Sequence, residues 1–473
     1  MKKTRLTLII FVTLVILGFL FIGKTDNRLI LGIKELVPQS VKNILRDNIF
    51  FVFKQKNQIE NLSKLNSRLE EENNLLKMSA YKLQKIQNNL LYDSINNSYN
   101  LPLTEVLQIK SNDNSKYKLT KYFFPAISWQ YNDRKPSGYL FNHEEYLFTV
   151  SGEGEIGYLD VNEFKNNSQI TLYKIDSNLK ELVNDHIIYS KSRYGFRGIM
   201  ISKNKIFLSY QKKIKENCYN ISIISAELNF KNLNFEDFFS FAECSNKMSN
   251  HTGGKMIPYN DESFLFTIGD AQAFSSVQDD KSLFGKLIKI NYLNKNYKLI
   301  AKGMRDSQGG YYYEDKKVLV MTEHGPQGGD EINVLKESEF NDYVNYGWPI
   351  ASYGKVIYND IKELKYQNHS KHGFKEPAYW YKKNSIAPSN IINADGFIEN
   401  SIGDFFLSAM GNTPAPGRRS LHHIKFNDDF SDIVFFNVIP IQERIRDLFY
   451  IKKINKIVMI LENSPSIAVL EVL

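Results

Sequence analysis

The chain has few cysteines: only Cys218 and Cys244 occur among its 473 residues. Neither cysteine lies in a CxxC or Cys/His spacing, which argues against a structural zinc site. In an oxidising compartment the two could form a disulfide, but the sequence does not show whether their geometry permits it. A basic tract with interleaved aromatic residues is also missing, because the net charge of +8 comes from scattered lysines and arginines. We therefore expect no nucleic-acid partner.

One long apolar run is present, at the N-terminus. Residues Leu6 to Gly23 follow the basic start MKKTR, and a run of this length can just span a bilayer as a helix. No small-residue cleavage pattern follows, which favours an uncleaved anchor over a signal peptide. The basic start should stay in the cytoplasm by the positive-inside rule. We predict a single-pass protein of the cell (inner) membrane, anchored by residues 1–26, with the rest on the periplasmic, extracytoplasmic side.

Glycine and proline are missing from about Lys54 to Leu91, where leucines recur every seven residues. These leucines are Leu62, Leu69, Leu76, Leu83 and Leu90. Sustained heptads indicate a coiled coil. The second apolar position of the heptad holds Leu65 and Ile86, but Glu72 and Ser79 interrupt it. We predict that residues 27–100 form a helical stalk, with a homo-oligomer assembled through the 62–90 coiled coil. The alternative is a single amphipathic helix lying on the domain that follows.

From about Leu101, helical periodicity gives way to short apolar strands separated by polar turns. Six strands share an apolar core followed by a polar or glycine-containing exit. They are centred on Phe148, Phe207, Phe266, Val320, Phe406 and Met459. Near-regular repetition of strand units is typical of a β-propeller. We predict that residues 101–473 form an all-β, six-bladed propeller with an insertion at about 353–383; a β-sandwich with accidental spacing is the alternative.

Polar residues that follow the repeated strands would converge on one face near the propeller axis, which is a natural ligand site. The exits include Gly269–Asp270 and His324–Gly325, and the neighbouring loops carry His251 and Arg305. The segment Met321 to Asn333, MTEHGPQGGDEIN, combines glycines with carboxylates. Glycines allow close backbone approach, and carboxylates and carbonyls are the oxygen ligands that Ca²⁺ prefers. The alternative is a tight turn between two strands.

Two arginines precede the last repeated strand. Arg444 and Arg446 alternate along an extended segment, so their side chains should point the same way. Two guanidinium groups on one face suit a polycarboxylate or another anion. The alternative is a surface salt-bridge pair with Glu443 and Asp447.

Seven ordered blocks together resemble a known family. They are HTGGKMIPYNDESFLFTIGD, SLFGKLIKIN, GMRDSQGG, EHGPQGGDEIN, NYGWP, SIAPS and ERIRDL. The resemblance is to the glucose/sorbosone dehydrogenase family, the soluble pyrroloquinoline-quinone-dependent aldose dehydrogenases. It runs from about Gly195 to the C-terminus, with a weaker first blade around Phe148. The fold of that family is a six-bladed propeller.

The resemblance implies an enzyme that oxidises an aldose to a lactone by hydride transfer to pyrroloquinoline quinone. His251 matches the base that takes the proton from the anomeric hydroxyl of the sugar. Arg305 matches the arginine beside the reacting quinone carbonyl. Arg444 and Arg446 match the pair that binds the carboxylates of the cofactor.

The resemblance also implies Ca²⁺. The carbonyls of Gly325 and Pro326 match ligands of the ion that holds the cofactor, and Glu331 with the Tyr346 carbonyl matches a second, structural Ca²⁺ site. At the cofactor position Asp306 stands where many members have Asn, and a carboxylate beside an anionic quinone is unfavourable unless it is protonated or paired.

A second departure is Met410, in a Ser-Ala-Met stretch where some members have Ser-Leu-Lys. The insertion GNTPAPG then precedes Arg418 and Arg419, either of which could replace the missing lysine. These departures leave an alternative function open, a non-catalytic propeller that binds a carbohydrate or protein partner.

Overall fold

The computed structural model describes eleven stretches of the chain: residues 62–72, 91–124, 138–152, 154–165, 168–183, 195–247, 249, 251–355, 368–382, 385–411 and 415–473. The chain divides into two units, Met1–Ser79 and Ala80–Leu473, and we describe each by itself. The predicted membrane anchor lies outside the described residues. Within the stretches given above, no helix is both long enough and apolar enough to cross a membrane.

In the first unit, residues 62–72 are helical. Leu62, Leu65 and Leu69 are exposed on this helix. The rest of the heptad region, residues 73–90, lies outside the described part of the chain. The helical stalk, the coiled coil and its pairing with a second chain stay predictions.

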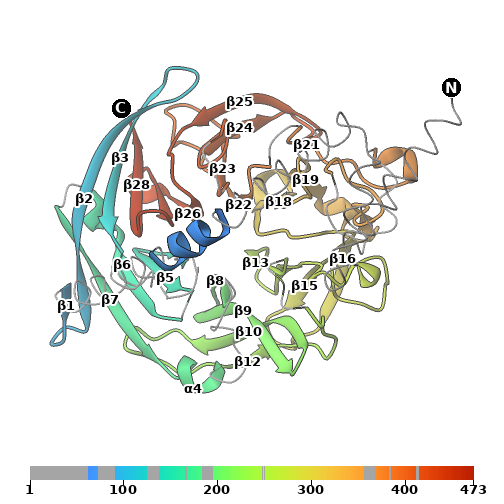
Figure 1. Cartoon of the computed structure of the whole chain (residues 1–473), viewed down its shortest axis with the longest axis horizontal. Helices are drawn as coiled ribbons and strands as arrows, with labels where there is room; N and C mark the ends of the chain where they lie inside the picture. Colours follow the sequence, from blue (N-terminus) through green and yellow to red (C-terminus); the bar gives the residue numbers. More distant parts are fainter. Residues whose placement is uncertain are drawn as a thin grey trace, which may run out of the picture. The chain divides into compact units, whose positions relative to one another are not determined.

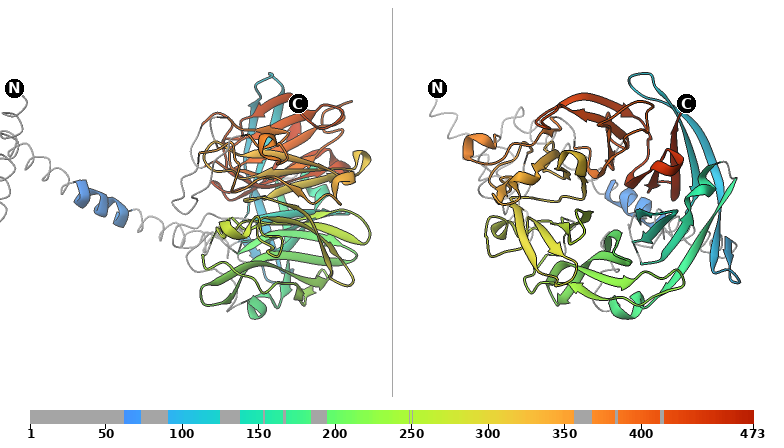
Figure 2. Two further views of the ribbon diagram at one scale, coloured as in Figure 1. Left: turned by 90° about the vertical axis from the view of Figure 1, so that its right-hand side faces the viewer. Right: turned by 180° about the vertical axis from the view of Figure 1, so that it is seen from behind.

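The second unit is an all-β propeller whose strands are arranged around a centre (Figures 1 and 2). Within the described residues, the strand order gives six antiparallel groups of four strands. The first three groups are β4 (Gly138–His143), β5 (Tyr146–Ser151), β6 (Ile156–Asp160) and β7 (Gln169–Ser177); β8 (Phe196–Ser202), β9 (Lys205–Lys215), β10 (Cys218–Glu227) and β12 (Glu236–Phe239); and β13 (Gly253–Pro258), β14 (Ser263–Ile268), β15 (Lys286–Asn291) and β16 (Tyr297–Lys302).

The other three groups follow in chain order. They are β17 (Gly309–Tyr313), β18 (Val318–Glu323), β19 (Glu331–Lys336) and β21 (Tyr379–Trp380); β22 (Pro388–Asn393), β23 (Phe405–Ala409), β24 (Leu421–Phe426) and β25 (Ile433–Ile439); and β26 (Ile445–Ile451), β27 (Lys456–Leu461), β28 (Ser466–Val472) and β3 (Lys116–Phe123). Short elements complete the unit: β1 (Tyr92–Asp93), β11 (Asn232–Leu233), β20 (Val344–Asn345), α4 (Leu179–Val183), and the 3₁₀ turns η1 (Val161–Lys165), η2 (Phe274–Ser276), η3 (Glu314–Lys316), η4 (Glu337–Glu339), η5 (Ser370–His372) and η6 (Lys452–Ile454).

The ring is closed by strands from both ends of the unit. β3 pairs antiparallel with β28, and its hairpin partner β2 (Ser98–Lys110) pairs with both β3 and β7. One continuous sheet thus joins the last group of strands to the first. Closure of this kind removes the open edges that would otherwise invite association with other chains.

The repeated strands predicted from the sequence are the second strands of the six groups. Their central residues are all buried, at 1% exposure or less: Phe148 on β5, Phe207 on β9, Phe266 on β14, Val320 on β18, Phe406 on β23 and Met459 on β27. These strands read as nearly continuous apolar runs because both of their faces are covered. The prediction of an all-β propeller is confirmed.

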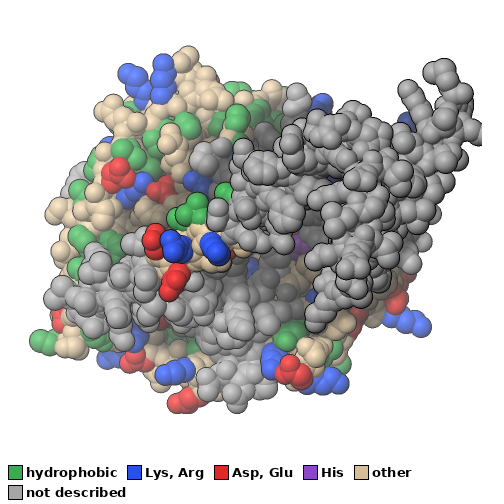
Figure 3. Space-filling view, viewed as in Figure 1, with side chains coloured by type: hydrophobic (Ala, Val, Ile, Leu, Met, Phe, Trp, Pro, Cys, Tyr) green, Lys and Arg blue, Asp and Glu red, His purple; other side chains and the backbone are tan. Residues whose placement is uncertain are grey.

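On the face of the molecule that Figure 3 shows, the described charged side chains have no single dominant sign. Among the coloured residues in Figure 3, Lys and Arg are interspersed with Asp and Glu. This distribution agrees with the scattered charge of the sequence.

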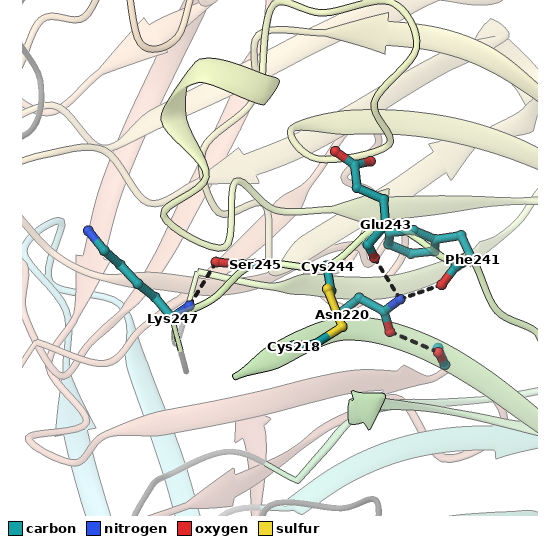
Figure 4. The surroundings of a disulfide bond; sticks show 8 residues. Cys218, Asn220, Phe241, Glu243, Cys244, Ser245 and Lys247 are labelled. Atoms are coloured by element: carbon teal, nitrogen blue, oxygen red, sulfur yellow. Dashed lines mark hydrogen bonds between the residues drawn. A yellow bond between two sulfur atoms is a disulfide. The ribbon is translucent and has the colours of Figure 1, made fainter. Parts of the chain in front are cut away.

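The two cysteines form a disulfide, which joins Cys218 at the start of β10 to Cys244 (Figure 4). The side-chain amide of Asn220 donates to the carbonyls of Phe241 and Glu243 at 2.7 and 3.0 Å. Next to the disulfide, Tyr219 and Ser245 exchange backbone hydrogen bonds. The disulfide therefore fastens to β10 the segment that leads on to His251.

We expect the double substitution Cys218→Ser/Cys244→Ser to lower the free energy of unfolding. The two cysteines are 26 residues apart, and the loss of a cross-link over such a loop costs about 3–4 kcal/mol in the chain-entropy model. Equilibrium urea unfolding with and without reductant measures this change. Reductant should destabilise the unsubstituted chain and leave the stability of the double variant unchanged. Equal stability of the two proteins without reductant would contradict the prediction.

Candidate active site

His251 lies between an acidic and a basic side chain. Its Nδ1 lies 3.2 Å from Oδ1 of Asp270, and its Nε2 lies 3.0 Å from the guanidinium of Arg305. A guanidinium only donates hydrogen bonds, so Nε2 must carry the lone pair and Nδ1 the proton, which is donated to Asp270. Asp270 is itself held by the indole N–H of Trp348 at 2.7 Å and by the backbone N–H of Gln272 at 2.8 Å.

The loop that carries His251 packs tightly against the exit of β14. A Cβ added at Gly269 would lie 2.4 Å from the carbonyl oxygen of His251. Only glycine permits this approach. The backbone of the two segments is also hydrogen-bonded, since Ala271 N–H donates to the His251 carbonyl at 2.7 Å. The Gly269–Asp270 exit is therefore where the sequence predicted it, beside His251.

Arg305 is held at three points. Its backbone N–H donates to Glu323 at 2.6 Å, and its Nη1 donates to the carbonyl of His324 at 2.5 Å. Its guanidinium carbon lies 5.5 Å from the ring centre of Trp348, within the range of a cation–π contact. The side chain is buried, so its charge is fixed beside the imidazole of His251 and little screened by water.

Asp306 is paired through hydrogen bonds. Its carboxylate accepts the backbone N–H of Gly253 at 3.0 Å and the side-chain amide of Gln308 at 2.8 Å. The side-chain amide oxygen of Gln308 in turn accepts a hydrogen bond from Nη1 of Arg446 at 3.3 Å. The carboxylate that replaces the common Asn is thus stabilised within the protein, and it links the Arg305 region to the arginine pair.

Arg444 and Arg446 share one buried carboxylate. Nε of Arg444 donates to Glu462 at 2.7 Å, and Nε of Arg446 donates to the other oxygen of Glu462 at 2.5 Å. All three side chains are buried. Burial alone would raise the pKa of Glu462, but the guanidinium groups of Arg446 and Arg444 lower it below its ordinary value.

The alternative of a surface salt-bridge pair with Glu443 and Asp447 is wrong. Glu443 instead contacts Lys121 at 3.2 Å, and Asp447 accepts the backbone N–H of Leu140 at 2.9 Å and the side-chain amide of Asn390 at 2.7 Å. These contacts give both carboxylates hydrogen-bond partners other than the two guanidinium groups, and Asp447 acts on Arg446 only through its charge.

Met410 and the arginines after it occupy the other side of Arg444. Nη1 of Arg444 donates to the Met410 carbonyl, and its Nη2 lies 3.7 Å from the Met410 sulfur. Nε of Arg418 donates to the carbonyl of Ser385 at 2.7 Å, and Nε of Arg419 to that of Gly411 at 3.2 Å. Met410 is therefore in contact with the arginine pair, whereas Arg418 and Arg419 each direct Nε to a backbone carbonyl.

All four predicted metal ligands line one small cavity. Its walls include Gly325, Pro326, Glu331 and Tyr346, together with Gly303, Arg305, Glu323, Gly329, Asn333, Trp348, Ala351, Ser352 and His369. A separate surface hollow, around Lys317 and Asp429, contains none of the predicted site residues. The turn at Gly325 is so tight that an added Cβ would lie 1.7 Å from the carbonyl oxygen of Gly329.

The chemistry of this cavity suits a cation. Burial raises the pKa of Glu331 to about 8, that of Asp330 to about 6, and that of Glu323 well above its ordinary value. A positive charge in the cavity would stabilise the ionised forms of the Glu331 and Glu323 carboxylates, which burial disfavours. In the described part of the chain, Oε2 of Glu323 and Oδ1 of Asn333 are buried without a hydrogen bond.

The donor set is mixed. Among the described residues no cluster of three or more His, Cys, Asp or Glu side chains has a geometry that could hold a metal. A cation in this cavity would therefore use carbonyl and amide oxygens as well as carboxylates, which Ca²⁺ accepts. The residues present thus fit the cation that the sequence predicted.

Comparison with known proteins decides the family. The family model for glucose / sorbosone dehydrogenase matches residues 164–465. The chain belongs to the glucose/sorbosone dehydrogenase family. The resemblance found in the sequence is thereby confirmed.

Two curated relatives match part of the chain. Aldose sugar dehydrogenase YliI of Escherichia coli (strain K12) is 28% identical over 163 residues, which are 31% of this chain and 42% of the relative. An uncharacterized protein of Synechocystis sp. is 26% identical over 223 residues, which are 42% of this chain and 50% of the relative. The chain thus spans half or less of the length of the curated relatives it matches.

Solved structures share the fold of the chain. A glucose dehydrogenase is 17% identical with a TM-score of 0.59, covering 78% of this chain and 99% of that one. The apo-form of the soluble aldose sugar dehydrogenase from Escherichia coli is 16% identical with a TM-score of 0.59 and the same coverage. The PQQ-bound form of aldose sugar dehydrogenase from Streptomyces coelicolor is 16% identical with a TM-score of 0.52, covering 76% and 99%.

Several residues of this family member's site were not predicted from the sequence. They are Gln308, Glu323, Trp348, His369 and Glu462. Glu323 and Glu462 come directly after the buried cores of β18 and β27, two of the six repeated strands. The rule that polar exits converge near the axis could therefore have identified both glutamates. Gln308, Trp348 and His369 do not follow a repeated strand, so this rule does not identify them.

Proposed function

We propose that the chain is a membrane-anchored, outward-facing quinoprotein oxidoreductase that oxidises an aldose to a lactone by hydride transfer to pyrroloquinoline quinone. The observation that carries this proposal is the contact of His251 with Asp270 on one side and with Arg305 on the other. A base with its lone pair at Nε2 lies next to a fixed positive charge, and both are buried. This arrangement suits removal of a proton from a hydroxyl group together with stabilisation of the negative charge that develops.

His251 is the proposed base. Its Nε2 takes the proton from the anomeric hydroxyl, and the Asp270 carboxylate stabilises the imidazolium that forms. Pyrroloquinoline quinone, when bound, supplies the hydride acceptor. Arg305 keeps its buried positive charge beside Nε2 of His251, where it would stabilise the negative charge that develops during the transfer.

The arginine pair is the proposed anchor for an anionic cofactor. Two guanidinium groups share the single carboxylate of Glu462, so the cluster keeps a net positive charge. That charge favours carboxylate groups of a ligand. Asp306 contributes through Gln308, which links it to Arg446. Ca²⁺ held by the carbonyls of Gly325 and Pro326 would add Lewis-acid polarisation, and a second Ca²⁺ held by Glu331 and the Tyr346 carbonyl would be structural.

The location outside the cytoplasm is part of the proposal. The apolar run within residues 1–26 would anchor the chain, and the propeller would face the periplasm. The Cys218–Cys244 disulfide supports this orientation, since disulfides persist in oxidising compartments. The 62–90 heptads would join copies of the chain in the membrane.

Titration of the purified chain with quinone and Ca²⁺, followed by absorbance and by dye reduction with a panel of aldoses, tests the function. We expect dye reduction to require both additions. Arg444→Ala should weaken cofactor binding by about 1.5–3 kcal/mol, the value of a lost charged hydrogen bond, and lower the rate at saturating cofactor less.

A matched control is Lys453→Ala, which removes an exposed positive charge that pairs with Glu145 on the surface. It should leave cofactor binding unchanged. If the unsubstituted chain neither binds quinone nor reduces a dye with any aldose, the oxidoreductase proposal fails and a propeller that binds a carbohydrate or protein partner takes its place.

A further inference from the structure

Trp348 contacts both of the side chains that flank His251. Its indole Nε1–H donates to Oδ2 of Asp270 at 2.7 Å, and the guanidinium carbon of Arg305 lies 5.5 Å from the centre of its ring. Asp270 contacts Nδ1 of His251, and Arg305 contacts Nε2 of the same imidazole. A single residue thus touches the acidic and the basic neighbour of the proposed base.

The two oxygens of the Asp270 carboxylate have different partners. Oδ1 lies 3.2 Å from Nδ1 of His251 and accepts the backbone N–H of Gln272 at 2.8 Å. Oδ2 accepts the indole N–H of Trp348, and the whole side chain of Asp270 is buried. A buried carboxylate oxygen without a hydrogen bond is costly. Loss of the indole N–H would therefore favour rotation of the carboxylate, which would take Oδ1 away from His251.

Trp348 is itself held from several sides. Its backbone N–H donates to the carbonyl of Gly303 at 3.0 Å, and its carbonyl accepts from the side-chain amide of Gln278 at 2.6 Å. The ring of Phe274 meets the indole edge to face, with ring centres 6.0 Å apart. The side chain of Trp348 is buried. Its N–H therefore has a fixed direction, which a group that orients another side chain needs.

A glycine lets the segment that carries Trp348 lie close to the loop of Arg305. A Cβ added at Gly303, where φ is +74°, would lie 2.3 Å from Oδ1 of Asn345 and 2.5 Å from the backbone nitrogen of Gly347. Only glycine permits this approach. The NYGWP block thus brings its tryptophan to the site, whereas in the sequence only the tyrosine of that block received a role.

We propose that Trp348 is a positioning residue for the proton transfer. Its indole N–H holds the Asp270 carboxylate, so that Nδ1 of His251 keeps its proton and Nε2 keeps its lone pair for the proton of the sugar hydroxyl. The face of the same ring attracts the guanidinium of Arg305. This inference rests on the proposed oxidoreductase function, to which it adds a residue that acts through Asp270.

Trp348→Phe removes the N–H and keeps an aromatic ring in the same place. We expect the rate of the reductive half-reaction at saturating sugar and quinone to fall by roughly 10- to 100-fold, because a displacement of about 1 Å at a reacting group can cost about 10²-fold. Quinone affinity and the KM for the sugar should change little. The matched control is Tyr313→Phe, which removes the hydroxyl that donates to Asp395 at 2.8 Å and should leave the rate unchanged.

A double-mutant cycle with Asp270→Asn distinguishes positioning from packing. Two residues that act as one unit have effects that do not add. If Trp348 acts through the carboxylate, Trp348→Phe should cost little further rate once Asp270 is already Asn. Losses that add in full would show that Trp348 contributes packing alone, and would overturn the proposal.

Nuclear magnetic resonance tests the same link in the full chain without quinone. The indole N–H signal of Trp348, one of three tryptophans, is assigned by its loss in Trp348→Phe. We expect Asp270→Asn to move this signal, because a neutral amide oxygen is a weaker acceptor than a carboxylate. The Nδ1–H signal of His251, assigned by its loss in His251→Asn, should shift and exchange faster with water in Trp348→Phe, and should stay unchanged in Tyr313→Phe.

Two spectral results would also overturn the proposal. One is a Trp348 indole signal that Asp270→Asn leaves unchanged, a measurement that keeps the tryptophan in place. The other is a His251 Nδ1–H signal that Trp348→Phe leaves unchanged. A chain that shows both spectral changes but reduces no dye would retain the link from Trp348 to His251 and reject only the oxidoreductase proposal.

Discussion

Replacing His251 by alanine should lower the rate of sugar oxidation by roughly 10²- to 10⁴-fold, the usual contribution of a positioned base. Cofactor affinity should change little, because the imidazole acts on the sugar hydroxyl. The expected loss is large because the geometry prepares a single nitrogen to accept the proton. Asp270 fixes the proton of the neutral ring on Nδ1, and Nε2 keeps the lone pair beside Arg305.

Stopped-flow measurement of the reductive half-reaction at saturating quinone separates chemistry from binding. The control is His372→Ala, which removes an exposed imidazole and should leave the rate unchanged. A small loss of rate in His251→Ala, accompanied by a matching loss of quinone affinity, would show that His251 binds the cofactor and is not the base.

His324 is a second imidazole close to these groups, and burial lowers its pKa to about 4. It is therefore neutral above that pH and adds no positive charge beside Arg305. The backbone carbonyl of His324 contacts the site, because it accepts a hydrogen bond from Nη1 of Arg305. This neutral state leaves Arg305 as the fixed charge next to His251.

Much of the fold could be predicted from the repeated strands. Each second strand of a group is covered on both faces, so its sequence is a short apolar run that ends where the chain leaves the core. The run around Phe266, for example, belongs to a strand in which every residue is buried. The same reasoning placed Asp270 and His324 at a shared mouth, and the structure brings them into one network through His251 and Arg305.

The contacts that the predicted residues make with other residues could not be predicted as well from the sequence. Gln308 and Arg446 are 138 residues apart, and no local pattern shows which loops of neighbouring strand groups meet. The arginine pair was correctly predicted to point one way, but its neighbour Glu443 was a plausible partner and Glu462 is the real one. The residues assigned to two Ca²⁺ ions line one cavity, because the carboxylates of β18 and β19 are cross-strand neighbours.

Replacing Glu462 by alanine should lower the free energy of unfolding by about 3–5 kcal/mol, the cost of removing one partner from a buried ion pair. The loss would leave the guanidinium groups of Arg444 and Arg446 buried without the carboxylate that both contact. Glu145→Ala removes an exposed carboxylate that pairs with Lys453 and should cost less than about 1 kcal/mol. Urea unfolding at neutral pH compares the two variants.

The pH dependence of stability distinguishes the charge of Glu462 from its packing. Because the two arginines hold its pKa below the ordinary value in the folded chain, its contribution is present above the unfolded-state pKa of about 4.3 and is lost as the pH falls through the folded-state pKa. Glu462→Gln keeps the size of the side chain but removes the titration, so its stability should fall less steeply with acid than that of the unsubstituted chain. Parallel acid limbs for the two proteins would show that Glu462 stabilises the propeller through packing and hydrogen bonding alone, and that the positive charge of the arginine pair is balanced by another group.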